Sequence, residues 1–401
     1  MIDIKKIRQD FPIYGKHDKL IYLDSAASSL KLGVVTEEMG HYYHTMGVNV
    51  HRGAYDLAYE ATKLYEQARM TVAEFIHADA EEIIFTKGTT SALNLIAHAY
   101  RDILKPGDEI ITSELEHHSS LLPWMMNAKK TKAQLKYIPL TKAGRITVEG
   151  FKSVLSEKTK IVAITHVSNV MGYETPIYEI TKLAKAHGAI VVLDAAQSAP
   201  HQHIDVKALD VDFLAFSGHK IFGPSGVGVL YGKKALLNIL EPYEFGGEMA
   251  DEVHLDHATF KEAPLRFEAG TPVISGAIGL GAALRYVMAL DRKEVSNHLK
   301  DLHQYTLKQL KTIQGLTIYN ETAENPIITF NIEGIHPHDI ATMLDQDHVS
   351  IRAGHHCAQL VTRFLGVQST LRVSFHLYNS RTDCDALIES IIKAKAFFDK
   401  F

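Results

Sequence analysis

The stretch TKIVAITHVSNVMGYETPIYEITKLAKAHGAIVVLDAA, residues 159–196, indicates the fold class of this chain. It begins and ends with apolar runs rich in β-branched residues, and an amphipathic helical pattern over 176–188 lies between them. Pro176 and Gly188 stand at the two ends of that pattern, where proline and glycine commonly begin and end helices. Apolar strands separated by helices predict a mostly parallel sheet with helices on both faces, which is an α/β fold.

The same alternation continues on both sides of this stretch. The pattern TSALNLIAHAYRDIL, residues 90–104, predicts another helix. Further apolar runs predict strands at 82–86, 108–113, 212–217 and 226–232.

The pattern changes near residue 290. A helical segment at 298–313 is followed by three spaced strand-like runs, PIITFNIEG, HVSIRAG and LRVSFHLYN. We therefore predict three parts: an N-terminal segment, 1–20, that packs with a small domain; a large domain, 21–290; and a smaller α+β domain, 291–401.

Composition excludes several classes of protein. The chain has 401 residues, 46% of them hydrophobic, and a formal net charge of −5, so the basic excess of a nucleic-acid binder is missing. No apolar run reaches the roughly 18 residues that a membrane span needs. Two cysteines exclude a disulfide scaffold and suit a reducing compartment. We expect a cytoplasmic protein that binds neither nucleic acid nor membrane.

Two charged residues directly follow apolar strands, at the edge where open α/β sheets bind ligands. Asp194 either caps the next turn or pairs with a protonated ring nitrogen of a cofactor. Lys220, in FLAFSGHKIFGPSGVG, is either a solvated loop residue or a lysine that forms a Schiff base. The pair, with Ser217 and His219 beside the lysine, matches the chemistry of pyridoxal 5′-phosphate (PLP).

Two further motifs are compatible with that cofactor. TKGTTSALN, residues 86–94, leads from a strand into a helix and presents Thr89 and Thr90 at the helix start. It is either an ordinary helix cap or a cup for a phosphate group. His117, in ELEHHSSLLPW, either stacks on a flat ring or is an ordinary surface or core histidine.

Taken together, these motifs carry a resemblance that runs almost end to end. The chain resembles the SufS-type, group II, cysteine desulfurases, which belong to the class V aminotransferase-like, fold type I PLP enzymes with an aspartate aminotransferase-like fold. The motifs are YLDSAASS, NVHRGAY, FTKGTTSALNL, EHHSSLLPW, HVSNVMGYETPI, LDAAQSAPH, FSGHKIFGPSGVGVLY, RFEAGTP, RAGHHCAQ and LRVSFHLYN. Ser119 and Ser120 replace the usual Ala-Asn after the histidine pair, and Lys87 replaces the usual arginine.

The resemblance implies a cofactor site. Lys220 would bind PLP covalently, Asp194 would pair with the pyridinium nitrogen, and His117 would stack on the ring. Thr271 would reach the phosphate of the neighbouring subunit's cofactor, which implies a homodimer. The other implied cofactor residues are Gln197, Asn169, Thr89, Thr90, Ser217 and His219.

The resemblance also implies a substrate site and a reaction. Arg372 would bind the substrate carboxylate with help from Asn169, and the other implied residues of the L-cysteine pocket are Arg352, His51, Ala27 and His356. The implied catalytic residues are Cys357, Lys220 and His117. L-cysteine would become L-alanine, and a persulfide would remain on Cys357 for transfer to an acceptor in iron–sulfur cluster assembly.

The motif IRAGHHCAQL, residues 351–360, contains one of the two cysteines, and we considered three roles for it. A disulfide with Cys384 does not suit the cytosol. A zinc site needs about four ligands, and adjacent residues cannot easily converge on one ion, so we expect no metal. Arg352 and the histidines favour a thiolate, which predicts that Cys357 is the nucleophile. Cys384, among acidic residues at the start of a helix, is expected to be structural.

The sequence allows more than one sulfur acceptor and more than one activity. HPHD, residues 336–339, is either a polar helix start or, by resemblance, a contact with a SufU-type zinc protein through His338; a SufE-type acceptor is the alternative. Related enzymes would be a selenocysteine lyase, a cysteine sulfinate desulfinase or a class V aminotransferase. A non-catalytic sulfur or metal carrier is the alternative outside enzymes, and Asp194 with Lys220 argues against it.

Overall fold

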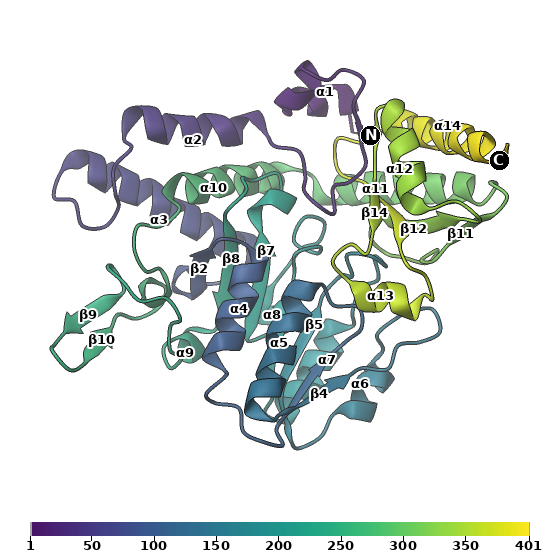
Figure 1. The fold of residues 1–401 in the computed structure, drawn as a ribbon. Coiled ribbons are helices and arrows are strands. Elements are labelled where there is room, and N and C mark those ends of the chain that lie inside the picture. Colours follow the sequence, from purple (N-terminus) through teal and green to yellow (C-terminus); the bar gives the residue numbers. More distant parts are fainter. Residues whose placement is uncertain (1, 401) are drawn as a thin grey trace.

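The computed structural model describes residues 2–400, and its largest element is a seven-stranded sheet (Figure 1). The strand order is β2-β8-β7-β6-β5-β3-β4. Only β8 is antiparallel to its neighbours, so the predicted mostly parallel sheet is confirmed. The strands are β2 Ile83–Thr86, β3 Glu109–Thr112, β4 Gln134–Tyr137, β5 Thr159–Thr165, β6 Ile190–Asp194, β7 Phe213–Ser217 and β8 Gly228–Gly232.

Helices cover both faces of this sheet because alternate strand residues point to opposite sides. In β6, Val191 and Leu193 face a core shared with α3, α7 and α10, whereas Val192 faces a second core shared with α4 and α5. The helices of this part are α2 Gly33–Thr45, α3 Asp56–Ile76, α4 Thr89–Ala99, α5 His118–Thr131, α6 Val148–Val154, α7 Ile177–Ala186, α8 Val206–Leu209, α9 Lys234–Leu237 and α10 Ile274–Ala289.

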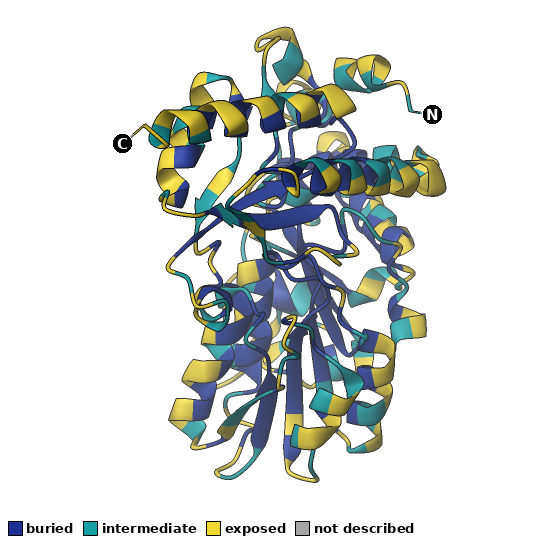
Figure 2. Cartoon of the chain, turned by 90° about the vertical axis from the view of Figure 1, so that its right-hand side faces the viewer, coloured by how far each residue is buried: buried dark blue, intermediate teal, exposed yellow. Residues whose placement is uncertain are grey.

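A smaller antiparallel sheet, in the order β11-β12-β15-β14, follows α10 in the chain. Its strands are β11 Leu316–Ile318, β12 Ile327–Ile332, β14 Arg352–Gly354 and β15 Thr370–Ser374, and buried residues of this sheet form a core with α11, α12 and α14 (Figure 2). The helices are α11 Arg292–Leu310, α12 Pro337–Gln346, α13 Gln359–Phe364 and α14 Arg381–Phe398. This is the predicted α+β arrangement, although the domain limits themselves stay a prediction.

The N-terminal segment contacts the C-terminal part of the chain. Helix α1, Ile4–Gln9, places the Arg8 guanidinium 2.6 Å from a carboxylate oxygen of Asp383 in α14. Arg8 Nε also donates to the Tyr378 carbonyl at 2.9 Å. Strand β1, Ile21–Tyr22, pairs in parallel with β13, Val349–Ser350, which continues toward the motif that carries Cys357.

Three details differ from the sequence expectations. The helix predicted at 298–313 already begins at Arg292, because the side chain of Asp291 caps it by accepting from Glu294 N–H. Strand β4 was not predicted, since its residues QLKY are polar and only partly buried. The hairpin of β9, Ala250–Val253, and β10, Ala258–Phe260, was also not predicted, because most of its side chains are exposed.

Helices α10 and α11 meet at a bend of 87°. Within residues 2–400, no single helix has the length and apolar composition to cross a membrane, and this bent pair qualifies only by length and composition. Eleven of the sixteen residues of α10 are buried, and the helix packs against α2 and α3.

Candidate active site

Most of the predicted site residues converge on one cavity of about 230 Å³ where β5, β6 and β7 end. Because the carboxyl ends of parallel strands lie at the same edge of a sheet, Asp194 and Ser217 at the ends of β6 and β7 face a common space. The predicted residues that line the cavity are Ala27, Thr89, Thr90, His117, Asn169, Asp194, Gln197, Ser217, His219, Lys220, Arg352, His356, Cys357 and Arg372.

Asp194 and Lys220 are two ionisable groups of this cavity, and each influences the pKa of the other. Burial raises the pKa of Asp194, and this rise is opposed by Lys220 and by the 2.9 Å hydrogen bond that Ala196 N–H donates. Burial lowers the pKa of Lys220 to about 8, against the influence of Asp194 and with that of Arg372. A lysine that loses its proton near neutral pH is suited to act as a nucleophile and as a base.

The helix start that was predicted as a phosphate cup lies against the end of β7. Thr89 N–H donates to Ser217 Oγ at 2.8 Å, and the two hydroxyl oxygens lie 2.7 Å apart. Gly88 has φ 147°, a conformation that other residues rarely adopt. A Cβ at Gly228 would lie 2.5 Å from Gly88 Cα, so only glycine permits this approach of the two chain segments.

His117 presents a neutral ring to the cavity. It caps α5: its Nδ1 accepts from Ser119 N–H at 3.1 Å and lies 2.7 Å from Ser119 Oγ. Burial and the nearby Lys220 lower the pKa of His117 to about 4. An uncharged planar imidazole that is fixed by its own helix cap is suited to stack on a flat cofactor ring.

Two arginines that line the cavity are joined by Asp24. One Asp24 oxygen lies 3.0 Å from Arg372 Nη2, and the other lies 3.0 Å from Arg352 Nε. Arg372 also donates to the Asn169 carbonyl at 2.9 Å, whereas its buried Nε has no partner. The sequence analysis did not single out Asp24, although it follows the apolar residues IYL just as Asp194 follows a strand.

Cys357 lies on a short loop between β14 and α13. His356 and Cys357 both have left-handed backbones, with φ 54° and 55°, which costs roughly 1–3 kcal/mol for each residue. The loop is held by Asn169 Nδ2, which donates to the His356 carbonyl at 2.7 Å, and by His118 N–H, which donates to the Cys357 carbonyl at 2.8 Å. The thiol is therefore kept exposed at the cavity by a backbone that the surrounding residues fix.

The imidazole ring of His356 on this loop is uncharged. Burial and the nearby Arg372 and Arg352 lower the pKa of His356 to about 2, and its Nε2 lies 2.9 Å from Thr370 Oγ1. His356 is thus a positioning group in this structure and carries no charge at neutral pH. Both cysteines are free thiols, and no group of three or more histidine, cysteine or acidic side chains within residues 2–400 could hold a metal ion.

Three predicted residues lie outside the cavity of this chain. His338 is exposed at the start of α12, with its ring 5.2 Å from that of His336. Thr271 is exposed after the short 3-10 helix Leu265–Phe267, and His51 Nε2 donates to Glu66 Oε1 at 3.0 Å. Arg69 links these last two regions, because it bridges Glu66 and Glu268.

Glu116 is a further residue that the sequence analysis did not single out. Burial raises its pKa to about 8, and Asp194 adds to the rise. One of its oxygens accepts from Ser113 Oγ at 2.6 Å and from Thr165 N–H at 3.1 Å. It precedes His117 and joins β5 to the start of α5, so it supports the wall that carries the stacking ring. Its only signal in the sequence is its place beside the histidine pair.

Comparisons with known proteins agree with this geometry. A model of the family Aminotransferase class-V matches residues 21–387. A probable cysteine desulfurase of Halalkalibacterium halodurans is 51% identical, with 99% of this chain and 98% of the relative covered. One of Staphylococcus epidermidis is 47% identical at the same coverage.

Two solved structures have the same fold. The cysteine desulfurase CsdA of Escherichia coli is 37% identical with a TM-score of 0.93, and 99% of both chains is covered. A cysteine desulfurase of Thermococcus onnurineus NA1 is 40% identical with a TM-score of 0.94, and 98% of both chains is covered. This chain belongs to the aminotransferase class-V family. The two bacterial relatives named above are probable cysteine desulfurases, and the two solved structures are cysteine desulfurases.

Proposed function

We infer that this protein is a PLP-dependent enzyme that removes sulfur from L-cysteine and leaves L-alanine. The observation that carries the inference is one cavity that contains Lys220, Asp194 and the exposed thiol of Cys357. An enzyme that only transfers an amino group has no use for a thiol at this place. A non-catalytic carrier has no use for a buried lysine and carboxylate that share a cavity.

The residues present fit the cofactor. Asp194 is a buried carboxylate with no ion pair within residues 2–400, so a protonated ring nitrogen is a suitable partner for it. Asn169 Oδ1 is buried without a partner, as a contact to a bound group requires. Lys220 would hold the cofactor covalently, His117 would stack on its ring, Gln197 would flank it, and the phosphate would lie among Thr89, Thr90, Ser217 and His219. When bound, PLP withdraws electron density from the substrate Cα.

The chain's own residues then position and convert the substrate. Arg372 binds the carboxylate of L-cysteine through its free Nε, and Asp24 keeps the guanidinium in place. Lys220, as a neutral amine, takes the Cα proton. The thiolate of Cys357 attacks the substrate sulfur, so that an S–S bond forms and the Cβ–S bond breaks. The electron pair of that bond and one proton stay with the departing alanine, and Cys357 keeps the persulfide.

The first test is a visible absorption spectrum of the purified protein before and after L-cysteine is added. A cofactor band that shifts, with alanine and protein-bound persulfide in equal amounts, supports the proposal. The matched control is Lys220→Ala, which removes the amine without touching the cup or the Cys357 loop. Turnover by Lys220→Ala at the native rate, or a protein that cannot be loaded with PLP, contradicts it.

We propose further that the enzyme is of the SufS type, group II, and passes sulfur to a SufU-type zinc protein for iron–sulfur cluster assembly. His338 supports this, since it is exposed and its imidazole is a suitable zinc ligand. His336 Nδ1 accepts from His338 N–H at 3.3 Å, which fixes the loop that presents both rings. A SufE-type acceptor, which needs no zinc ligand from its donor, is the alternative.

The acceptor is tested by measuring alanine formation with each acceptor type. His338→Ala should abolish stimulation by the zinc protein while basal turnover stays unchanged. His17→Ala, an exposed histidine in another part of the chain, is the matched control. Equal stimulation of both variants, or stimulation by a SufE-type acceptor alone, overturns this assignment.

We also propose that Thr271 and His51 act across a homodimer. Both lie outside the cavity of their own chain, and the Glu66–Arg69–Glu268 ion pairs connect their regions. Arg69 and Glu268 are buried, so the pair holds the Thr271 loop firmly on α3. Dialysis measures the affinity for PLP, and Thr271→Val should lose that affinity when the protein is diluted to monomers.

A free catalytic thiol requires a reducing environment, which favours the cytoplasm.

A further inference from the structure

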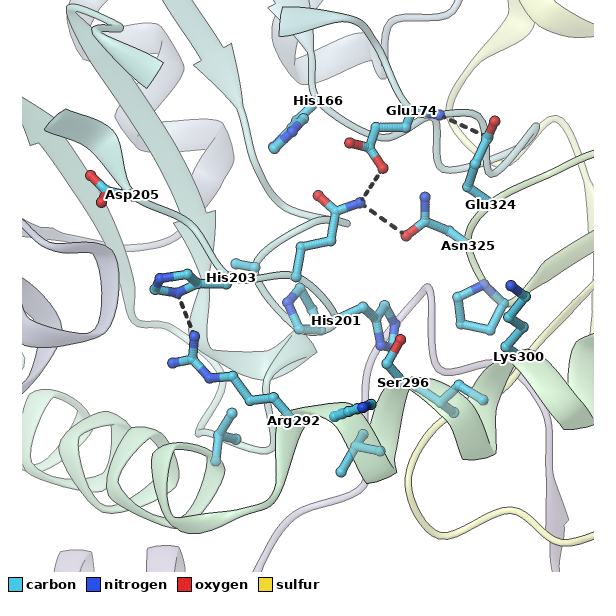
Figure 3. A pocket seen from close by; sticks show the side chains of 18 of the residues that line it. His166, Glu174, His201, His203, Asp205, Arg292, Ser296, Lys300, Glu324 and Asn325 are labelled. Carbon is cyan, nitrogen blue, oxygen red and sulfur yellow. Dashed lines mark hydrogen bonds between the residues drawn. The ribbon is translucent and has the colours of Figure 1, made fainter. Parts of the chain in front are cut away.

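A second cavity, of about 860 Å³, lies on the side of α11 that faces the large sheet (Figure 3). Its walls come from segments far apart in the sequence, namely the residues after β5, the turn after β6, α11 and the loop before β12. None of its lining residues takes part in the reaction proposed above. We call it the α11 cavity.

The floor of the α11 cavity consists of rings. His201 and His376 lie 4.8 Å apart between ring centroids, and Phe222 lies 4.1 Å from His376. Burial lowers the pKa of His166 and of His201 to about 4 each, so both are neutral at physiological pH. His201 is the least buried of these rings, and a flat neutral ring favours stacking with another flat ring.

Several histidine nitrogens of this cavity have no hydrogen-bond partner. His166 Nδ1, His201 Nδ1 and His303 Nε2 are buried and unpaired, and His166 and His303 are each only 5% exposed. A buried polar atom without a partner costs roughly 1–3 kcal/mol, so such atoms usually meet a ligand or an ordered water. Three of them around one cavity indicate a place where a polar molecule binds.

The charges at the mouth of the cavity are separated. Arg292, Lys293 and Lys300 of α11 line it, and none of the three has a carboxylate partner within residues 2–400. The Arg292 guanidinium donates a hydrogen bond to the ring of His203, which accepts it and is therefore neutral (Figure 3). This wall is free to bind an anion.

The acids that line the cavity are mostly engaged. Glu324 pairs with Arg145 at 2.6 Å, and Asp205 lies 3.0 Å from His77. Glu174 accepts from Gln202 Nε2 at 2.8 Å, and Glu179 is exposed. Gln202 Nε2 also donates to Asn325 Oδ1 at 3.4 Å, which leaves the carbonyl oxygen of Gln202 to recognise the edge of a heteroaromatic ring (Figure 3).

We propose that the α11 cavity binds a nucleotide-like molecule, that is, a heteroaromatic ring with an anionic phosphate tail. The ring lies on His201, the least buried ring of the floor, with its edge toward Gln202, and the phosphate meets Lys300. A mononucleotide occupies well under half of about 860 Å³, so size does not exclude it.

The α11 cavity adjoins the chain segments that carry Asp194, Lys220 and Arg372. His166 N–H donates to the Asp194 carbonyl at 2.9 Å, and Phe222 is two residues after Lys220. His376 is four residues after Arg372. A molecule bound there contacts both α11 and the segments that carry the cofactor residues, which gives the enzyme a place for a regulatory ligand.

The test is isothermal titration of the PLP-loaded enzyme with adenosine 5′-monophosphate, because the loaded cofactor already fills the phosphate cup. The expected result is one site per chain in the micromolar range and a melting temperature that rises with nucleotide concentration. Adenosine, which lacks the charge, and inorganic phosphate, which lacks the ring, should each bind at least about tenfold more weakly.

Variants locate the site. Lys300→Met should weaken the nucleotide by about tenfold, and Ser296→Trp, which fills the cavity from α11, should abolish binding. Lys308→Met removes a lysine of the same helix outside the cavity and should change nothing. No binding of adenosine 5′-monophosphate, or equal binding by Ser296→Trp, overturns the proposal; the cavity then holds water only. Because no readout depends on turnover, these outcomes do not bear on the desulfurase activity.

Discussion

The two cysteines of this chain lie in regions that treat the same thiol in opposite ways. Cys357 lies on a left-handed loop, exposed at the cavity of Lys220 and Asp194. Cys384 lies in the first turn of α14 with an exposed fraction of 0%, and its Sγ donates to the Ser380 carbonyl at 3.4 Å. Burial raises the pKa of the Cys384 thiol to about 12, and Asp383 and Asp385 add to the rise.

The difference teaches that reactivity is set by the backbone and by access. A helix with a packed face keeps its thiol protonated, because a buried thiolate lacks water and lacks a cation. The Cys357 loop contains two residues with strained backbones, and this conformation keeps the sulfur in contact with the cavity.

The largest effect is expected from Cys357→Ala. Alanine formation from L-cysteine should fall by roughly 1,000-fold or more, because the attacking sulfur is missing, while the visible cofactor band stays. Cys384→Ala is the matched control and should stay within about twofold of the native rate. Loss of activity in the control rather than in the Cys357 variant would reverse the roles given to the two thiols.

Selenocysteine as substrate sharpens the same comparison. Selenium can leave without attack by a thiol, so Cys357→Ala should keep selenocysteine turnover while it loses cysteine turnover. Elimination assays on both substrates, with one enzyme preparation, measure the ratio. Equal loss on both substrates would mean that Cys357 also supports the cavity itself.

Alkylation rates compare the two thiols directly. Iodoacetamide should modify Cys357 in the native protein at least roughly 100-fold faster than Cys384, since modification of the buried thiol requires local opening. Peptide mass spectrometry of timed samples measures both rates at once. Comparable rates in the native state would show that the first turn of α14 opens readily and would remove the contrast.

His118→Ala should have a smaller effect. His118 Nε2 accepts from Gln359 N–H at 3.2 Å at the start of α13, so the variant loosens one side of the Cys357 loop. We expect alanine formation to fall by about two- to tenfold with unchanged PLP affinity, as for the loss of one hydrogen bond. His298→Ala, whose ring bonds a carbonyl far from the loop, should leave the persulfide yield unchanged.

The smallest effect concerns stability. Cys384→Ala should lower the free energy of unfolding by about 1 kcal/mol near neutral pH, because a buried sulfur is lost. Since the folded pKa is raised to about 12 from an ordinary value of 9.0, the contribution of Cys384 is complete below pH 9 and declines as the pH rises toward 12. The stability advantage of the native protein over Cys384→Ala in urea unfolding should therefore shrink above pH 9 and then reverse in sign; an advantage that grows with pH contradicts the buried neutral thiol.

The sequence predicted the parts of the fold that repeat a simple pattern. Strands β5 and β6 and helix α7 are apolar or amphipathic over their full length, so their periodicity is clear. Strand β4 has the polar residues QLKY at the edge of the sheet, and the β9–β10 hairpin has little buried surface, so neither has such a pattern.

The candidate site was predictable where one short motif contains both a strand end and a reactive side chain. Asp194, Ser217 and Lys220 meet this condition. Asp24 was missed, since its role depends on Arg352 and Arg372, which lie more than 300 residues away in the chain. The α11 cavity was missed for the same reason, because it exists only where α11 lies against the large sheet.

The most direct test of this account is peptide mass spectrometry of the PLP-loaded enzyme after one equivalent of L-cysteine without any acceptor. We expect the peptide that contains Cys357 to gain the mass of one sulfur atom, which a reducing agent should release. The peptide that contains Cys384 should gain no mass. Added sulfur on Cys384, or free sulfide with both peptides unmodified, would contradict it.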